Sequence, residues 1–229
     1  MAILETKNLT YTYGVGTPFE KTAVENVNLS VEKGAFVGVI GHTGSGKSTL
    51  IQMLNGLIRP TSGQVLLNGE DIWAKPKEIR RVRFQVGMVF QYPEYQLFEE
   101  TVIKDIMFGP KNMGLSDEEA LKRAKEAAHF TDLKPELLEK SPFELSGGEK
   151  QRIAYARALV NNPYIVIADE PTGNLDKETS DEIISLFMKL HEEEHTLIIV
   201  THDANLASLA DAVYRIDSGK VNRENREVS

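Results

Sequence analysis

The sequence predicts an α/β fold with a mostly parallel central sheet, an antiparallel β layer at its edge and an inserted helical subdomain. Short apolar, β-branched runs alternate with amphipathic helical patterns, which is typical of parallel βαβ units. The first third instead has strand patterns separated by glycine and polar turns, which favours antiparallel pairing. At 229 residues the chain is expected to form a single domain spanning 1–229.

The composition removes several classes of function. Cysteine is absent from the sequence, which excludes a disulfide scaffold, a thiolate zinc site and cysteine nucleophile chemistry. Lysine and arginine number 26 and aspartate and glutamate 34, which gives a net charge of −8. This acidic balance argues against a nucleic-acid partner, so none is expected. Because no apolar run reaches the ~18 residues of a membrane span and the N-terminus lacks a signal-peptide pattern, we expect a cytoplasmic chain.

The first third predicts the antiparallel layer. Strand patterns occupy 9–13, 24–31 and 64–67, and glycine-containing turns separate them. Near the other end of the chain, the turn Ser218-Gly219-Lys220 predicts a closing hairpin.

The central sheet is predicted by four short apolar runs. These buried strands are expected at Phe36–Ile40, 86–90, 164–168 and 197–200. Helical patterns follow three of them, including those at 48–57 and 177–194. Strands interleaved with helices favour a parallel arrangement.

Residues 92–145 interrupt the strand–helix alternation. The segment 116–130 is strongly helical, and Ser116 with Glu119 has the capping-box spacing that begins a helix. We therefore expect 92–145 to form a helical subdomain inserted between two strands of the main sheet.

A glycine-rich motif directly follows the first buried strand. The residues Gly41-His42-Thr43-Gly44-Ser45-Gly46-Lys47-Ser48 fit G-x-x-x-x-G-K-[ST]. Glycines let successive backbone N–H groups point at a phosphate, and the helix N-terminus adds its positive dipole end. Lys47 supplies a positive charge for the β- and γ-phosphates, and Ser48 offers a hydroxyl to Mg²⁺. The strand before the motif and the helix after it disfavour an incidental glycine-rich turn.

A second strand ends in two acids, Asp169 and Glu170. The carboxyl edge of a central strand is where open α/β sheets bind ligands. We expect Asp169 to hold Mg²⁺, directly or through water, and Glu170 to orient or deprotonate the attacking water. The alternative is that both acids merely cap a helix.

A second glycine motif, Leu145-Ser146-Gly147-Gly148, precedes another helical pattern. Two glycines at a helix start favour a further anion site. Ser146 and Glu149 also have the capping-box spacing, so the serine could simply cap its own helix. Local sequence leaves these two alternatives open.

Together these residues resemble the ATP-binding subunits of ABC transporters. Leu-Ser-Gly-Gly at 145–148 resembles the signature motif of that family, and the other landmarks follow in the family's order over residues 3–221. Gln91 resembles the Q-loop glutamine, Gly173-Asn174-Leu175-Asp176 the D-loop and His202 the switch histidine. Tyr13 matches the aromatic residue that stacks on adenine, with Tyr11 as the alternative. Taken singly, His202, Gln91 and Tyr13 would be ordinary loop and strand residues.

The resemblance implies a P-loop NTPase fold that uses ATP and Mg²⁺. It implies catalytic roles for Glu170, His202, Gln91 and Lys47, and Mg²⁺ contacts from Ser48, Gln91 and Asp169. The nucleotide contacts that it implies come from Tyr13, Gly41, His42, Thr43, Gly44, Ser45, Gly46, Lys47, Ser48, Thr49, Ser146, Gly147, Gly148 and Asp176.

The resemblance also implies partners. Two ATP-binding subunits, identical or paralogous, are expected to pack head to tail, so that Ser146 to Gly148 of one completes the phosphate-loop site of the other. Integral membrane subunits are expected to dock on the chain at the inner face of the cell membrane. Tyr92, Tyr95 and Phe98, next to Gln91, could form the docking groove. The alternative is that these aromatics pack the core of the helical subdomain.

Two parts of the chain resemble different branches of this family. Residues 1–148 resemble the energy-coupling-factor branch, which drives vitamin and metal-ion uptake, and residues 149–229 resemble the lipoprotein-release and macrolide-export branch. A natural or engineered chimera and ordinary divergence are the two explanations. A soluble ABC ATPase is a further alternative, but DNA-acting members have long coiled coils that this chain lacks. A non-hydrolysing module would be expected to lack Glu170 or His202.

Overall fold

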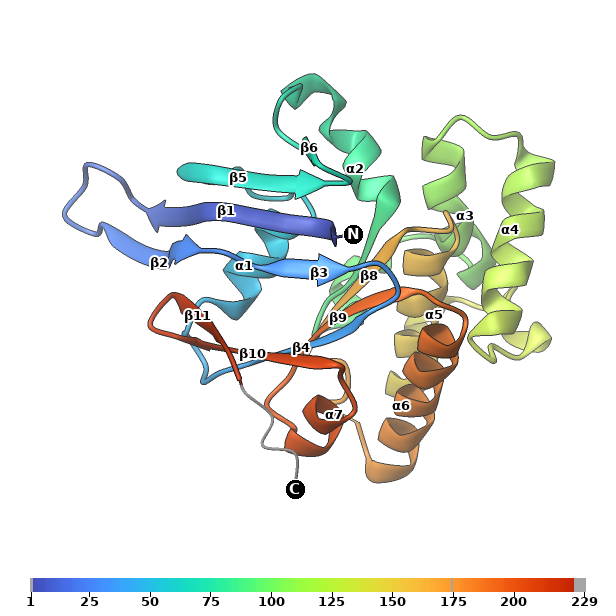
Figure 1. Cartoon of the computed structure of the whole chain (residues 1–229). Coiled ribbons are helices and arrows are strands. Elements are labelled where there is room, and N and C mark those ends of the chain that lie inside the picture. The colour runs from blue at the N-terminus through green and yellow to red at the C-terminus, as the bar shows by residue number, and fades with distance from the viewer. Residues whose placement is uncertain (1, 174, 225–229) are drawn as a thin grey trace.

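The computed structural model describes residues 2–173 and 175–224, which form two β-sheets with helices packed around them (Figure 1). The strands are β1 (Ala2–Tyr13), β2 (Lys21–Val27), β3 (Ser30–Glu32), β4 (Phe36–Ile40), β5 (Ser62–Leu67), β6 (Glu70–Asp71), β7 (Val86–Val89), β8 (Ile165–Asp169), β9 (Thr196–Val200), β10 (Ala212–Asp217) and β11 (Lys220–Arg223). The α-helices are α1 (Lys47–Leu54), α2 (Ile79–Gln85), α3 (Val102–Asn112), α4 (Asp117–Phe130), α5 (Gly147–Leu159), α6 (Lys177–Glu192) and α7 (Ala204–Ser208). Short 3₁₀ turns occupy Pro76–Glu78, Pro93–Gln96, Pro135–Leu137 and Pro142–Glu144.

The larger sheet has the strand order β11-β10-β4-β9-β8-β7, and its strands from β10 to β7 are parallel. Every residue of β8 and β9 is buried, as expected for parallel strands covered on both faces. The four predicted central strands are confirmed to within one residue at each end. The closing hairpin is also confirmed, because Asp217 pairs with Lys220 across the turn.

The smaller sheet is the predicted antiparallel layer, with the order β2-β1-β5-β6 and β3 paired to β1. Strand β1 begins at Ala2, seven residues before the predicted start at residue 9. The apolar alternation that would have indicated one long strand is broken near Asn8, where φ is +47° and the pairing register shifts. The first half of β1 pairs with β3 and β5, and the second half pairs with β2.

Helix α1 lies between the two sheets, and its buried residues Leu50, Ile51 and Leu54 join one apolar core with both of them. A second core lies between the central sheet and α5, α6 and α7. The first of these cores holds α1, and with it the glycine-rich loop, against the central sheet. None of the helices in the described part of the chain combines the length and apolar character needed to span a membrane.

The segment between β7 and β8 contains α3, α4 and α5. A third apolar core joins these helices through residues such as Ile106, Ala124 and Ile153. Ser116 begins α4, because its hydroxyl accepts a hydrogen bond from the Glu119 N–H at 3.2 Å. The Glu119 carboxylate instead pairs with Arg123 at 2.9 Å. Helix α5 contributes to both the second and the third core, so it joins the predicted insertion 92–145 to the central sheet.

Candidate active site

Four strands of the larger sheet end at the same edge. In the parallel register, Val39 of β4 pairs with Val200 of β9, which also pairs with Asp169 of β8. Val89 of β7 pairs with Ala168 of β8. The residues that follow these strands therefore meet at the carboxyl edge, which is the ligand edge of open α/β sheets.

The glycine-rich motif of residues 41–48 forms the turn between β4 and the start of α1. Gly46 is the residue before α1 and has φ of +110°. A Cβ at this position would overlap the backbone carbonyl oxygen of Ala23, so only glycine fits. The C-terminal hairpin supports the loop from outside, because the Gly219 N–H donates to the Ser45 carbonyl at 3.0 Å. The loop is thus held by two segments that are distant in sequence.

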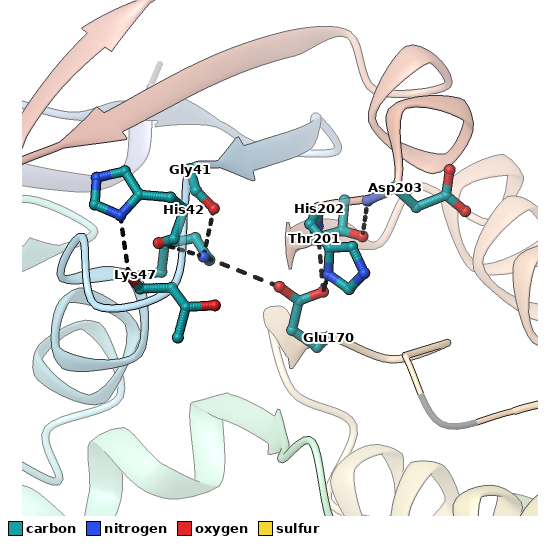
Figure 2. A network of polar contacts seen from close by, with 8 residues as sticks. Gly41, His42, Lys47, Glu170, Thr201, His202 and Asp203 are labelled. Atoms are coloured by element: carbon teal, nitrogen blue, oxygen red, sulfur yellow. Dashed lines mark hydrogen bonds and ion pairs between the residues drawn. The ribbon is translucent and has the colours of Figure 1, made fainter.

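Lys47 lies inside this loop with its side chain only 9% exposed. Its Nζ donates to the carbonyl oxygens of Gly41 at 2.6 Å and His42 at 3.1 Å (Figure 2). The same Nζ lies 4.0 Å from Oε1 of Glu170. The ammonium is therefore positioned at the centre of the loop, where it can bind phosphate oxygens.

Glu170 lies between Lys47 and His202 (Figure 2). Its Oε2 accepts hydrogen bonds from the backbone N–H of His202 at 3.2 Å and contacts the ring Nδ1 at 2.8 Å. The Glu170 side chain is 11% exposed, whereas that of His202 is 71% exposed. The backbone of Glu170 has φ of +47°, which is uncommon for a non-glycine residue. A carboxylate fixed at this edge can orient or deprotonate a water molecule.

Asp169 is buried at the end of β8 and faces Ser48. Burial raises the pKa of Asp169, and the hydrogen bond from Ser48 opposes that rise. A carboxylate beside a hydroxyl is an oxygen pair that suits Mg²⁺, which commonly keeps several water and phosphate ligands. Among the described residues, no group of three or more His, Asp or Glu side chains is arranged to hold a metal ion. The donor set thus fits Mg²⁺ bound together with a nucleotide.

Gln91 stands two residues beyond the end of β7 and is half-buried. Because β7 and β8 are parallel and in register, Gln91 and Glu170 each follow the paired residues Val89 and Ala168 by two positions. The sheet thus places Gln91 at the same edge as the two acids.

Tyr13, the last residue of β1, lies beside the first turn of α1. Its hydroxyl is 3.0 Å from the Thr49 hydroxyl, and its ring contacts the Tyr11 ring edge-to-face at 4.8 Å. Tyr13 is 44% exposed, whereas Tyr11 packs against the core. Of the two predicted adenine partners, Tyr13 is the one whose ring is accessible beside the phosphate loop.

The second glycine motif begins α5. Ser146 forms a complete capping box with Glu149, which places the serine hydroxyl on its own helix. The backbone hydrogen bond from Ser146 holds the pKa of Glu149 below its usual value. Ser146 and Gly147 are exposed, and a Cβ on Gly147 would meet no atom within 4 Å. The helix start is therefore capped and also accessible from outside.

Asp176 caps α6, since its carboxylate accepts from the Thr179 N–H at 3.0 Å and the Thr179 hydroxyl at 2.8 Å. These bonds hold the pKa of Asp176 below its usual value. Asn174 of the predicted D-loop lies outside the described residues. The alternative that Asp169 and Glu170 cap a helix is wrong, because α6 begins at Lys177 with Asp176 as its cap.

Sequence reasoning missed Asp217 as a partner of the phosphate loop. Its Oδ1 lies 3.2 Å from Nε2 of His42, although 175 positions separate the two residues. The other ring nitrogen of His42 faces the Thr43 carbonyl at 2.9 Å. The bond to Thr43 and then the bond to Asp217 raise the pKa of His42. Only the hairpin β10–β11 brings this pair together, so no local pattern could have indicated it.

The aromatics near Gln91 are on the surface of the chain. Tyr95 is 84% exposed, Phe98 52% and Tyr92 43%, so the alternative that they fill the subdomain core is wrong. The Phe98 ring packs edge-to-face against the Phe108 ring, with 4.7 Å between the ring centroids. The Arg157 guanidinium carbon lies 5.5 Å from the centroid of the Phe98 ring. These aromatic residues form a fixed apolar surface next to the site.

Comparison with known proteins identifies the family. The profile described as "ABC transporter" matches residues 24–173. The chain belongs to the ABC transporter family. An energy-coupling factor transporter ATP-binding protein, EcfA2 of Ligilactobacillus salivarius, is 50% identical over 222 residues, which cover 95% of this chain and 77% of that protein.

Solved ABC cassettes have the same fold. The dimeric structure of MJ0796, described as a bacterial ABC transporter cassette, matches with a TM-score of 0.88 and 36% identity and covers 97% of both chains. The same cassette in a post-hydrolysis state with ADP and Pi matches with a TM-score of 0.88 and 35% identity, covering 97% of this chain and 98% of that one. The P-loop NTPase fold is thereby confirmed, and the chain is an ATP-hydrolysing ABC cassette.

Proposed function

We propose that this chain is the ATP-hydrolysing subunit of an energy-coupling-factor transporter and powers uptake by closing, with a second ATP-binding subunit, around two MgATP. The observation that carries the proposal is the convergence of Lys47, Glu170 and His202 at one sheet edge. The identity of 50% to an energy-coupling relative runs through 95% of the chain, past the glycine motif at 148, and favours this branch over an exporter. A chimera stays a hypothesis that this match does not require.

Each side chain has a role that its position supports. Lys47 binds the terminal phosphates from within the loop, and Glu170 orients the attacking water and takes its proton. His202 holds Glu170 through two contacts and is exposed enough to reach the γ-phosphate. Ser48 and Asp169, with Gln91, would hold Mg²⁺, which when bound neutralises charge on the phosphates.

The exposed start of α5 supports a site shared between two subunits. Ser146 caps its helix in the lone chain, and the free backbone N–H groups of the first turn still point outward. A two-fold pairing would place them against the phosphates held by the partner. Hydrolysis then removes the shared γ-phosphate and opens the dimer. This arrangement accommodates both alternatives that the local sequence left open.

The test compares purified wild-type chain with Glu170→Gln. The glutamine keeps the shape of the side chain and removes the base, so ATP should accumulate a stable dimer that hydrolyses very slowly. Size-exclusion chromatography with and without MgATP measures the dimer, and phosphate release measures the turnover. A Glu170→Gln chain that hydrolyses ATP like the wild type would contradict the assigned base.

We propose further that integral membrane subunits dock on the surface formed by Tyr92, Tyr95 and Phe98. This surface is apolar, exposed and adjacent to Gln91, so occupancy of the nucleotide site can affect it. Tyr95→Glu should abolish co-purification of membrane subunits while basal ATPase activity stays. Tyr164→Glu is the matched control, because Tyr164 is a 50% exposed aromatic at the opposite end of β8. Equal co-purification with both variants would contradict the docking surface, and the identity of the captured subunits would distinguish an uptake system from an exporter.

A further inference from the structure

A buried amide joins α5 to the segment that carries the catalytic acid. Gln151 is only 3% exposed, and its Nε2 donates to the Pro171 carbonyl and to the Tyr155 hydroxyl, each at 3.2 Å. Pro171 is the residue directly after Glu170. A buried amide is costly unless its hydrogen bonds are made, and the apolar surroundings strengthen those that are. Displacement of the segment after Glu170 would therefore remove one of the two hydrogen-bond partners of this buried amide unless α5 moved with it.

Two further contacts join α5 to α6, the helix that follows the segment after Glu170. A Cβ on Gly148 would lie 2.8 Å from Cγ2 of Thr179, so the first turn of α5 packs closely against the first turn of α6. Arg152, one turn further along α5, pairs with Glu182 of α6 at 2.5 Å. Helix α5 is thus fastened to the region on both sides of Asp176.

These contacts connect Glu170 to the start of α5, and the two have different roles in the proposed dimer. Glu170 acts on the ATP held by the same chain, whereas the exposed start of α5 faces the ATP of the partner subunit. We propose that Gln151 is a positioning residue that keeps Glu170 and the start of α5 in fixed register, so that the state of one ATP site is passed to the other. The inference rests on the proposed function, because it requires a site shared between two subunits.

The test uses dimers that contain a single live site. Because the inactive site keeps its ATP and holds the dimer closed after one hydrolysis event, a single turnover is measured: kcat is the rate constant of that turnover at saturating MgATP, and KM is the MgATP concentration that gives half of that rate. A trace of one protomer with intact Glu170 is mixed with a large excess of a Glu170→Gln protomer, so that nearly every intact protomer pairs with an inactive one. The live site then has Lys47 and Glu170 from the trace protomer and the α5 start from the excess protomer. Gln151→Met is placed in the trace protomer in one mixture and in the excess protomer in another.

The inference predicts that Gln151→Met lowers kcat of the live site by about tenfold in either placement, since small misplacements of catalytic groups have effects of that order or more. KM for MgATP should stay within about twofold, because the phosphate loop of the live site is unchanged. Tyr155→Phe is the control: it removes the other partner of the amide and leaves the bond to Pro171. Its kcat should stay within about twofold of the unmodified mixture, even where its melting temperature falls.

Several outcomes would overturn the inference. An unchanged kcat in both placements of a folded Gln151→Met would leave the amide a purely structural role. A decrease in only one placement would mean that Gln151 supports one element without linking the two. Gln151→Leu also lacks the amide donor; it replaces the methionine variant if that chain lacks a cooperative melting transition, with the same expectation. Failure of the proposed function is distinguishable, because the mixture without any Gln151 substitution would then show no turnover or no dependence on the excess protomer.

Discussion

Asp105 is a fully buried carboxylate, and we expect the stability of the fold to depend on its charge. Its Oδ2 accepts hydrogen bonds from the N–H groups of Phe98 and Glu99 at 2.9 and 3.0 Å. Its Oδ1 lies 2.6 Å from a guanidinium nitrogen of Arg157, as an ion pair rather than an aligned hydrogen bond. In Asp105→Asn the amide NH₂ must face either the guanidinium or the two backbone N–H groups, and all of these are donors. Burial already lowers the pKa of Arg157, and the substitution removes the charge that opposes this.

Breaking a buried ion pair from one side costs about 3–5 kcal/mol. Because each kcal/mol lowers the melting temperature of a chain of this size by about 2–4 °C, we expect a decrease of about 6–20 °C. Docking of membrane subunits should weaken as well, since the Asp105 carboxylate fixes the backbone that carries Phe98. Urea titration and calorimetry measure the stability, and Glu100→Gln is the control, because its ion pair with Lys104 is exposed and should contribute little. An Asp105→Asn chain as stable as Glu100→Gln would refute the reasoning.

Three other predictions concern the phosphate loop. Lys47→Ala should weaken MgATP binding or lower turnover by a factor of ~10², the scale for one preorganised donor, and values within about twofold of wild type would contradict the loop assignment. Gly46→Ala should lower the melting temperature and abolish nucleotide binding. Gly16→Ala is the control, because Gly16 also has a positive φ but open space where the Cβ would lie, so nucleotide binding should stay intact. Equal effects of the two substitutions would show that the overlap with the Ala23 carbonyl does not matter. In an NMR titration, Asp217→Asn should lower the pKa of His42, and an unchanged pKa would contradict the contact. Because the pKa of His42 is raised in the folded chain, the pair contributes fully to the stability of the fold below about pH 6.5, and this contribution is lost as the pH rises through the pKa of the folded chain.

The sequence predicted the parts of the fold that depend on local pattern. The apolar runs at β4 and β9 needed no other information, because buried parallel strands are continuously apolar. The phosphate loop was predictable because its glycine motif, the strand before it and the helix after it are contiguous in the sequence. Strand β1 was only half predicted, because the irregularity at Asn8 breaks the alternation on which the prediction relies.

The contacts that position the site could not be predicted locally. His42 and Asp217 are 175 positions apart, and Gln151 bonds a carbonyl 20 positions away. A polar residue in a helix gives no indication of its partner until tertiary packing buries it. The two roles of Ser146 also could not be separated by local pattern, because a capping serine and an anion-binding serine occupy the same position at a helix start.

The concentration dependence of ATPase activity tests the shared site most directly. If each site needs the phosphate loop of one subunit and the start of α5 from another, turnover per wild-type chain should fall on dilution, as mass action separates the dimer. The MgATP-dependent dimerisation constant, measured independently by sedimentation, fixes the concentration at which the fall should occur. Specific activity that stays constant well below that constant would show that a lone chain hydrolyses ATP, and the shared-site account would be wrong.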